Sequence, residues 1–423
     1  MKIGIQTWGS EGDVRPLLAL AAGLRQAGHD VTLAITHLEN RDFGPLAEAY
    51  GVPTRSVGHL DPAVLEAAGR KLITVTNPLK QVRIIADELF DPLAGEMLDA
   101  AQALCRENDL VIGHFLLHPL QAAAEQAGVP HAAVFLAPLL PSRQVPVPGL
   151  PDVGFLNVLA WRIGGAVIDR MFLPSVAAVR ARLGLAPPGS VLRDVYQSRG
   201  LNLVGVSEAL FPRPSDWPAN VQLCGAFTLP GRGAPRELPG DLRRFLDAGP
   251  PPVYLTFGSM FAADPDAAAT AALLTDAAGR ANCRAIVQCG AREAAAMGTG
   301  DDLFVIGGLA DHDLIFPRCA AVVHHGGSGT TQAASLAGRP SIVVPHATDQ
   351  AFWAALLHRR GIAPRPLDRR RVTARSLAGA IGSVLASRSM QERARVIGGA
   401  MRREDGVKRA VELIDMRYDR SRA

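Results

Sequence analysis

The feature that most constrains the fold is a repeated alternation between short apolar runs and longer segments with helical periodicity. The apolar runs are hydrophobic throughout, which is typical of strands buried on both faces of a parallel sheet. They form two series along the chain, at 2–8, 30–36, 109–115, 131–137 and 202–207, and at 252–258, 283–290, 303–308, 320–325 and 340–346. The alternation predicts an α/β fold with one doubly wound, Rossmann-like sheet in each half.

A segment rich in proline and glycine, 228–252, separates the two series. We therefore expect an N-terminal domain at 1–220 and a C-terminal domain at 221–401, with a linker at about 228–252. The helical stretch at about 402–423 is expected to pack back on the N-terminal domain. Ligands of open α/β sheets bind beyond the carboxyl ends of the strands. Two such domains facing each other across a cleft would bring two substrates together.

The bulk composition excludes several classes of protein. A formal net charge of +4 over 423 residues, with 48% hydrophobic and 20% charged residues, is ordinary for a globular protein and does not indicate nucleic-acid binding. The five scattered cysteines form no CxxC motif, which favours reduced thiols and a cytoplasmic location.

The most apolar region, 153–174, is interrupted by Arg162, by Asp169 and by two adjacent glycines, so it does not predict a transmembrane helix. It fits either an amphipathic surface or the wall of an apolar pocket, and a peripheral membrane contact is compatible with it.

The loop "HHGGSGTTQ" at 324–332 joins an apolar strand to a helix. Helix N-termini expose unpaired N–H groups with a partial positive charge, and glycines let a phosphate approach the backbone. Hydroxyl residues such as Ser328 and Thr330 add donors, and His325 could donate a charge-assisted hydrogen bond. The sequence has neither GxGxxG nor a Walker lysine here. The loop therefore predicts a phosphate site of neither the NAD nor the ATP kind; the alternative is an ordinary helix cap with glycine turns.

The segment "GSEGDVRP" at 9–16 joins the first strand to the first helix. Because proline is favoured at the first helical position, Pro16 predicts Arg15 as the N-cap. Asp13 would then precede the helix and could point towards a ligand. The alternative is that Asp13 itself caps the helix.

Several motifs together resemble family 1 glycosyltransferases with the GT-B fold, above all the sterol glucosyltransferases and the bacterial antibiotic glycosyltransferases. They are "GSEGDVRPLLALAAGL" at 9–24, "HHGGSGTT" at 324–331, "GRP" at 338–340 and "VVPHATDQAFWA" at 343–354. The resemblance covers most of the chain and is weak between 55 and 200. It implies a nucleotide-sugar co-substrate, a UDP-sugar or a TDP-sugar, with no other cofactor and no metal.

The resemblance also implies donor-binding residues in the C-terminal half. His325 and the backbone N–H groups that follow it would hold the pyrophosphate, with the Thr330 hydroxyl, and Asp349 and Gln350 would bind the sugar hydroxyls. Where plant members carry a glutamate for the ribose, this chain has Ala333. The full expected donor set is Ser259, His325, Gly326, Gly327, Ser328, Gly329, Thr330, Asp349 and Gln350.

For catalysis the resemblance implies that Asp13 acts as general base towards an acceptor hydroxyl, with inversion at the anomeric carbon. By rough alignment His114 falls where plant members pair an aspartate with their base, so we expect an Asp13–His114 pair in which a charged imidazolium holds the carboxylate ionised. The alternative for His114 is a backbone-bonded residue at a strand end. The acceptor pocket is expected in the weakly matching region, with Phe115, His118 and Trp161 as contacts.

The resulting functional hypothesis is an inverting, metal-independent glycosyltransferase that moves a hexose, glucose from UDP-glucose, to a hydroxyl of an apolar small molecule such as a sterol, a polyketide or a flavonoid. One alternative is a TDP-deoxysugar transferase of antibiotic biosynthesis. Another is a non-catalytic partner that stabilises a true transferase, although such a protein should have lost Asp13, His325 or Asp349, and all three are present.

Overall fold

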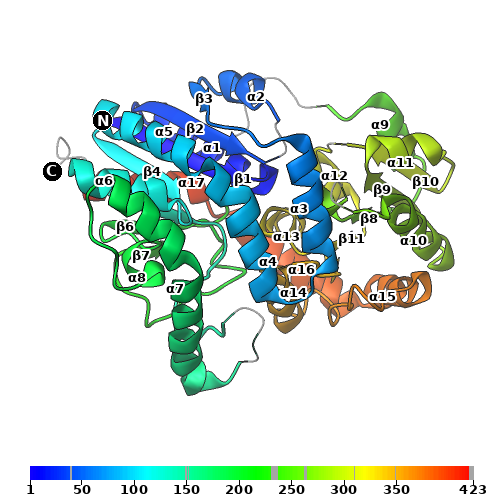
Figure 1. Ribbon diagram of the computed structural model, residues 1–423. Coiled ribbons are helices and arrows are strands. Elements are labelled where there is room, and N and C mark those ends of the chain that lie inside the picture. The colour runs from blue at the N-terminus through cyan, green and yellow to red at the C-terminus, as the bar shows by residue number, and fades with distance from the viewer. Residues whose placement is uncertain are drawn as a thin grey trace. The chain divides into compact units, whose positions relative to one another are not determined.

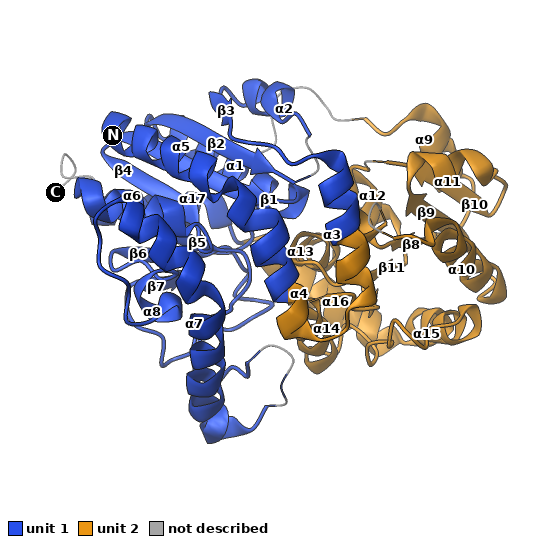
Figure 2. Ribbon diagram, in the orientation of Figure 1, with its two compact units in different colours: residues 1–68, 82–232, 404–423 blue, residues 69–81, 233–403 orange. Residues whose placement is uncertain are grey.

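The computed structural model describes residues 1–38, 41–147, 150, 152–229, 237–261, 264–308, 310–347 and 349–418, without the side chain of Ser259. The chain forms two compact units, each with a parallel sheet (Figures 1 and 2). Unit 1 holds residues 1–68, 82–232 and 404–423, and unit 2 holds 69–81 and 233–403. This division differs from the expected one because residues 69–81, from the N-terminal half of the sequence, group with unit 2.

In unit 1 the described residues form a sheet of seven parallel strands in the order β3-β2-β1-β4-β5-β6-β7. The strands are β1 Lys2–Gly9, β2 Asp30–His37, β3 Thr54–Ser56, β4 Leu110–His114, β5 His131–Phe135, β6 Leu201–Val204 and β7 Val221–Leu223. The helices are α1 Glu11–Gln26, α2 Gly44–Ala49, α5 Ala94–Glu107, α6 His118–Ala127, α7 Asn157–Arg182, α8 Val191–Asp194 and α17 Gly406–Tyr418, with the π-helix η1 Ile85–Phe90 and the 3₁₀ helices η2 Asp91–Leu93 and η3 Gly154–Leu156. Helices α3 Pro62–Thr74 and α4 Pro78–Ile84 cross the boundaries between the units.

In unit 2 the described residues form a sheet of five parallel strands in the order β10-β9-β8-β11-β12. The strands are β8 Val253–Thr256, β9 Ala285–Cys289, β10 Leu303–Gly307, β11 Ala321–His324 and β12 Ser341–Val343. The helices are α9 Gly240–Asp247, α10 Ala267–Arg280, α11 Ala291–Ala296, α12 His312–Ile315, α13 Ser328–Leu336, α14 Gln350–Arg359, α15 Ala374–Ala386 and α16 Arg388–Met401, with the turns η4 Gly258–Met260 and η5 Phe316–Arg318.

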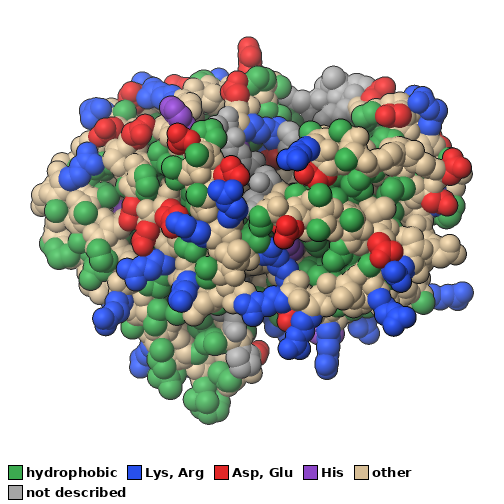
Figure 3. All heavy atoms as spheres, turned by 45° about the vertical axis from the view of Figure 1, so that its right-hand side comes forward, with side chains coloured by type: hydrophobic (Ala, Val, Ile, Leu, Met, Phe, Trp, Pro, Cys, Tyr) green, Lys and Arg blue, Asp and Glu red, His purple; other side chains and the backbone are tan. Residues whose placement is uncertain are grey.

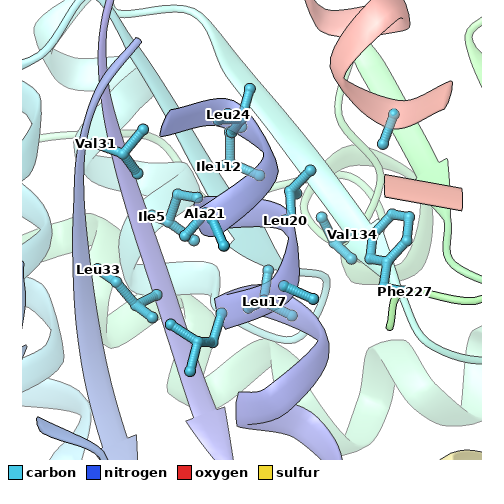
Figure 4. Close-up of a cluster of buried hydrophobic side chains, with 14 of the residues drawn as sticks. Ile5, Leu17, Leu20, Ala21, Leu24, Val31, Leu33, Ile112, Val134 and Phe227 are labelled. Atoms are coloured by element: carbon cyan, nitrogen blue, oxygen red, sulfur yellow. The ribbon is translucent and has the colours of Figure 1, made fainter. Parts of the chain in front are cut away.

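The core of unit 1 is built around α1. Its side chains Leu17, Leu20 and Leu24 follow one another at helical spacing and are fully buried against the sheet (Figure 4). Helix α17 joins the same core through residues such as Val411 and Ile414, so the end of the chain packs on its beginning.

Each sheet has one point at which the strand order reverses, and this point places the candidate sites. In unit 1 it lies between β1 and β4, and in unit 2 between β8 and β11. Loops that leave the carboxyl ends of these strands diverge there and leave room for a ligand. Asp13 follows β1 and His114 ends β4, whereas Gly258 follows β8 and His325 follows β11. The fold therefore selects the same loops that the motifs indicate.

None of the described helices combines the length and the apolar character needed to cross a membrane. Among the described residues, the strands that the sequence did not predict are β3 and β7, two three-residue strands at the edges of the sheet in unit 1. Strands this short carry too few residues to show a pattern.

Candidate functional site

The loop between β1 and α1 fixes the position of Asp13. Helix α1 begins at Glu11 with Ser10 as its N-cap, so the expectation of Arg15 as the cap is wrong, and Pro16 lies inside the helix. The Asp13 Oδ2 atom accepts hydrogen bonds from the Ser10 N–H at 2.8 Å and from the Ser10 hydroxyl at 3.0 Å. This Ser-x-x-Asp arrangement is a capping box, and its bonds outweigh the preference of proline for the first helical position.

The other carboxylate oxygen of Asp13 faces His114. Asp13 Oδ1 lies 3.9 Å from His114 Nε2, and the Asp13 side chain stays 33% exposed. Burial raises the pKa of Asp13, while the two hydrogen bonds from Ser10 lower it, and burial is the larger effect. The structure thus ties one oxygen into the helix cap and leaves the other beside a histidine.

His114 is a buried, neutral partner rather than a charged one. It is the last residue of β4, and burial lowers its pKa to about 4, so the imidazole is uncharged at neutral pH. The expectation of a charged His114 is therefore wrong, because the imidazole is too deeply buried at the strand end to stay protonated. Its Nδ1 atom is buried without a hydrogen-bond partner among the described residues.

The expected acceptor contacts lie in two different environments of unit 1. Phe115 is half-buried, with its ring 4.8 Å from the rings of His114 and Phe135. His118 is buried at the start of α6, and its Nε2 lies 3.4 Å from the Ser175 hydroxyl. Trp161 is buried in α7 and donates a 2.8 Å hydrogen bond to the Val145 carbonyl.

In unit 2 the imidazole of His325 is enclosed by two glycines. A Cβ atom at Gly327 would lie 2.4 Å from His325 Nε2, and one at Gly258 would lie 2.9 Å from His325 Cε1. The close fit explains why glycine stands at both positions, and at Gly258 a φ of +57° adds a second reason. Burial lowers the pKa of His325 to about 4, and its Nδ1 atom lacks a partner among the described residues.

Helix α13 begins directly after this imidazole. Gly327 is its N-cap, so the first-turn N–H groups, at Ser328, Gly329 and Thr330, have no acceptor inside the helix. His324, whose side chain is fully buried, accepts a 3.1 Å hydrogen bond from the Gly326 N–H through Nδ1 and so fixes the loop. The imidazole of His325 and a helix N-terminus together can bind an anionic group.

The segment before α14 holds the two residues expected to contact the sugar. Asp349 is the N-cap of α14, and Gln350 is buried as its first residue. Gln350 Oε1 accepts hydrogen bonds from the His346 N–H at 2.7 Å and the Ala347 N–H at 3.0 Å. Gln350 also lies beside Gly326, since a Cβ there would be 3.3 Å from Gln350 Cβ. Its amide oxygen shapes the loop, which leaves the amide NH₂ as the group that could reach a sugar.

The side chain of Ser259 lies outside the described part of the chain, although its backbone belongs to η4 beside His325. His312, the first residue of α12, is packed on the Phe316 ring at 4.4 Å and approaches Gln288 Oε1 at 3.2 Å. Within the described residues no group of three or more His, Cys, Asp or Glu side chains could hold a metal ion.

The sequence reasoning missed Ser10 and Gly258 as parts of the two sites. Ser10 had a visible signal, because serine followed three residues later by aspartate is the spacing of a capping box. Gly258 gave only a weak signal in the sequence, a glycine after an apolar strand. Its proximity to His325 could not be predicted, because the two residues are far apart in the sequence.

Comparison with known proteins finds relatives that match nearly the whole chain. Residues 272–405 match the family described as erythromycin biosynthesis protein CIII-like, C-terminal domain. The chain is 34% identical to O-mycaminosyltylonolide 6-deoxyallosyltransferase of Streptomyces fradiae, over 98% of this chain and 97% of that protein. It is 30% identical to a sterol 3-beta-glucosyltransferase of Arabidopsis thaliana, over 97% of this chain and 67% of that protein.

Solved structures share the fold at lower identity. The glycosyltransferase VinC, solved in complex with dTDP, superposes with a TM-score of 0.69 at 21% identity, over 99% of this chain and all of that one. The glycosyltransferase of kitacinnamycin gives a TM-score of 0.70, also at 21% identity, with 98% of each chain covered. The fold of two Rossmann-like units is thus the GT-B fold.

Proposed function

The chain belongs to the family 1 glycosyltransferases with the GT-B fold, and we propose that it transfers a hexose, glucose from UDP-glucose, to a hydroxyl of an apolar small molecule with inversion at the anomeric carbon. Membership is established by the 34% identity over nearly the whole of both chains and by the shared fold. A cytoplasmic location is part of the proposal, because all five cysteines are unpaired and a reducing compartment suits them.

One observation carries the chemical part of the proposal: at the reversal point of the sheet in unit 1, the two oxygens of Asp13 have different surroundings. Oδ2 accepts both hydrogen bonds from Ser10, whereas Oδ1 lies beside His114. An oxygen that holds no other bond can accept a proton, and a carboxylate with a raised pKa is a stronger base than an ordinary one. This geometry supports the proposal of Asp13 as the general base.

The transfer then proceeds as one displacement. Asp13 Oδ1 takes the proton of the acceptor hydroxyl while the hydroxyl oxygen forms a bond to the anomeric carbon. The bond from that carbon to the phosphate oxygen breaks, and the electron pair leaves with the nucleoside diphosphate. Attack from the face opposite the leaving group inverts the anomeric centre. Neutral His114 acts as a positioning residue that confines the carboxylate without competing for the proton.

The charge of the leaving diphosphate would be received in unit 2. The start of α13 offers N–H groups from Ser328 to Thr330, and His325 offers a ring N–H next to them. His325 is neutral without ligand, but a diphosphate would favour its protonated form and strengthen the hydrogen bond.

A second candidate donor is supported by one relative. The Streptomyces fradiae protein is named for the transfer of a 6-deoxyallosyl group, so a TDP-deoxysugar stands as the alternative to UDP-glucose. Gln350 bears on the choice, since its NH₂ group suits a hydroxyl that a deoxysugar could lack. Purified protein incubated with UDP- and TDP-sugars, and with sterol, polyketide and flavonoid acceptors, should yield a glycoside whose mass identifies the donor and whose anomeric configuration is opposite to that of the donor.

Asp13→Asn tests the base directly, because an amide keeps an acceptor for the Ser10 bonds but cannot take a proton. Loss of a general base lowers kcat by about 10²–10⁴-fold, and donor affinity should be unchanged. Asp109→Asn serves as the matched control and should keep full turnover, because Asp109 comes just before β4, at the opposite end of that strand from His114, and accepts a hydrogen bond from the Lys2 N–H. If Asp13→Asn transfers sugar at the wild-type rate, the assignment is wrong.

A further inference from the structure

The N-terminal half of α7 is apolar on two opposite faces, although only one of them is packed. Trp161 and Gly165 are buried on the inner face. Phe155, which precedes the helix, and Leu159 and Ile163 on the outer face are exposed, at 82%, 54% and 61%. Helices that are apolar all round are normally buried on all sides. The outer face of α7 therefore calls for a partner that unit 1 does not supply among the described residues.

The charges on this face are of one sign. Arg162 and Arg170 are exposed, and both fall on the outer side because they lie three and eleven residues after Leu159. The only acid of α7, Asp169, is turned inwards, where it accepts hydrogen bonds from the Val191 and Leu192 N–H groups. The apolar face is thus flanked by arginines.

The acid nearest to the start of α7 is also engaged. Asp152 accepts hydrogen bonds from the Gly154 N–H at 3.0 Å and from the Asn157 amide at 2.9 Å, so its charge is bound at the beginning of the helix. Figure 3 shows hydrophobic side chains gathered at the lower end, where Figure 1 places the start of α7.

We propose that the outer face of α7, formed by Phe155, Leu156, Leu159 and Ile163 with Arg162 and Arg170, docks the protein on the surface of an anionic lipid bilayer. Apolar side chains that enter the headgroup region, flanked by arginines near lipid phosphates, are the chemistry of interfacial helices. Apolar residues with arginine also occur in protein interfaces, and the test below distinguishes that case from a bilayer. The inference does not depend on the proposed sugar transfer, although an apolar acceptor dissolved in a bilayer would become accessible to a docked enzyme.

The test is flotation of the full chain with vesicles of phosphatidylcholine alone or mixed with phosphatidylglycerol. The wild-type protein should bind the mixed vesicles more strongly than the neutral ones. Phe155→Asp with Ile163→Asp should lower binding at least about tenfold, the change that corresponds to losing roughly one inserted apolar side chain. Arg162→Gln with Arg170→Gln should remove the preference for phosphatidylglycerol and the weakening of binding by salt.

Matched controls come from two other exposed apolar residues. Val396, 60% exposed on α16, and Met416, 70% exposed on α17, are as accessible as the α7 residues but lie outside the patch. Val396→Asp with Met416→Asp should bind vesicles like the wild type, and unchanged melting temperatures of all variants show that folding is intact. The proposal is overturned if the wild type floats with neither vesicle, or if the control variant loses as much binding. It is also overturned if the α7 variant only converts a dimer into a monomer, which would identify the partner as a second copy.

Discussion

Gly327→Ala offers a sharp test of the anion site because it perturbs the His325 imidazole without straining the backbone. Gly327 has φ −60° and ψ 145°, values that alanine adopts freely. The new Cβ would lie 2.4 Å from His325 Nε2, so the ring must move. Gly258 also lies close to the ring, near Cε1, and limits how far the ring can turn. The ring is thus displaced from the start of α13.

The substitution should change the nucleotide affinity much more than the stability of the protein. An off-rotamer imidazole costs about 0.5–1.5 kcal/mol, whereas replacing glycine by alanine at a compatible position stabilises by about 0.4–1 kcal/mol. These two terms nearly cancel, but alanine is a poorer N-cap than glycine, so the melting temperature should fall slightly. A hydrogen bond to a charged group contributes about 1.5–3 kcal/mol, so affinity for the diphosphate should fall roughly 10- to 100-fold.

Calorimetric titration with UDP and TDP measures this effect, with His325→Ala as the reference for complete loss of the imidazole. Gly379→Ala is the control, because Gly379 lies in α15 and nothing lies within 4 Å of the added Cβ. This variant should stabilise the helix by up to about 1 kcal/mol and leave the nucleotide affinity unchanged. Wild-type nucleotide affinity in Gly327→Ala would refute the placement of the diphosphate beside His325.

Three further predictions follow from the burial of charged and titratable groups. Because burial raises the pKa of Asp13, the acid limb of kcat/KM should lie above the usual carboxylate value of 3.8, and a limb at or below that value would contradict the assignment. Burial lowers the pKa of His324 to about 3 in the folded protein, below its value of 6.5 in the unfolded chain. As the pH drops below about 6.5, the unfolded chain therefore binds a proton at His324 that the folded protein does not, and the free energy of unfolding should fall. His324→Asn keeps an acceptor for the Gly326 N–H but does not titrate, so it should weaken this acid destabilisation in pH-dependent melting. Arg180→Met removes a buried guanidinium that donates hydrogen bonds to both Glu125 oxygens, at 2.8 and 2.9 Å. Because Glu125 is 38% exposed and can be solvated, the free energy of unfolding in urea should fall by only about 1–3 kcal/mol. An unchanged unfolding midpoint would show that the pair contributes nothing.

The sequence by itself determined those features of the protein that depend on short, local residue patterns. Runs apolar at every position fixed the buried parallel strands, because only a strand covered on both faces needs such a run. The glycine, hydroxyl and histidine residues of the 324–332 loop indicated the anion site, since each residue type contributes a donor or a close approach within one short segment. Asp13 and His114 were named from the family resemblance, Asp13 by its motif and His114 by a rough alignment.

Only the tertiary structure decided how those residues are placed and charged. Local spacing suggested Arg15 as the helix cap, but the packed loop uses Ser10 and turns Asp13 Oδ1 towards His114. Burial lowers the pKa of His114 and of His325, so both imidazoles are neutral. This burial depends on segments that are distant in the sequence, so local residue patterns could not predict it. The exposed outer face of α7 is a result of the same kind: the sequence shows an apolar helix, and only packing shows which of its faces stays uncovered.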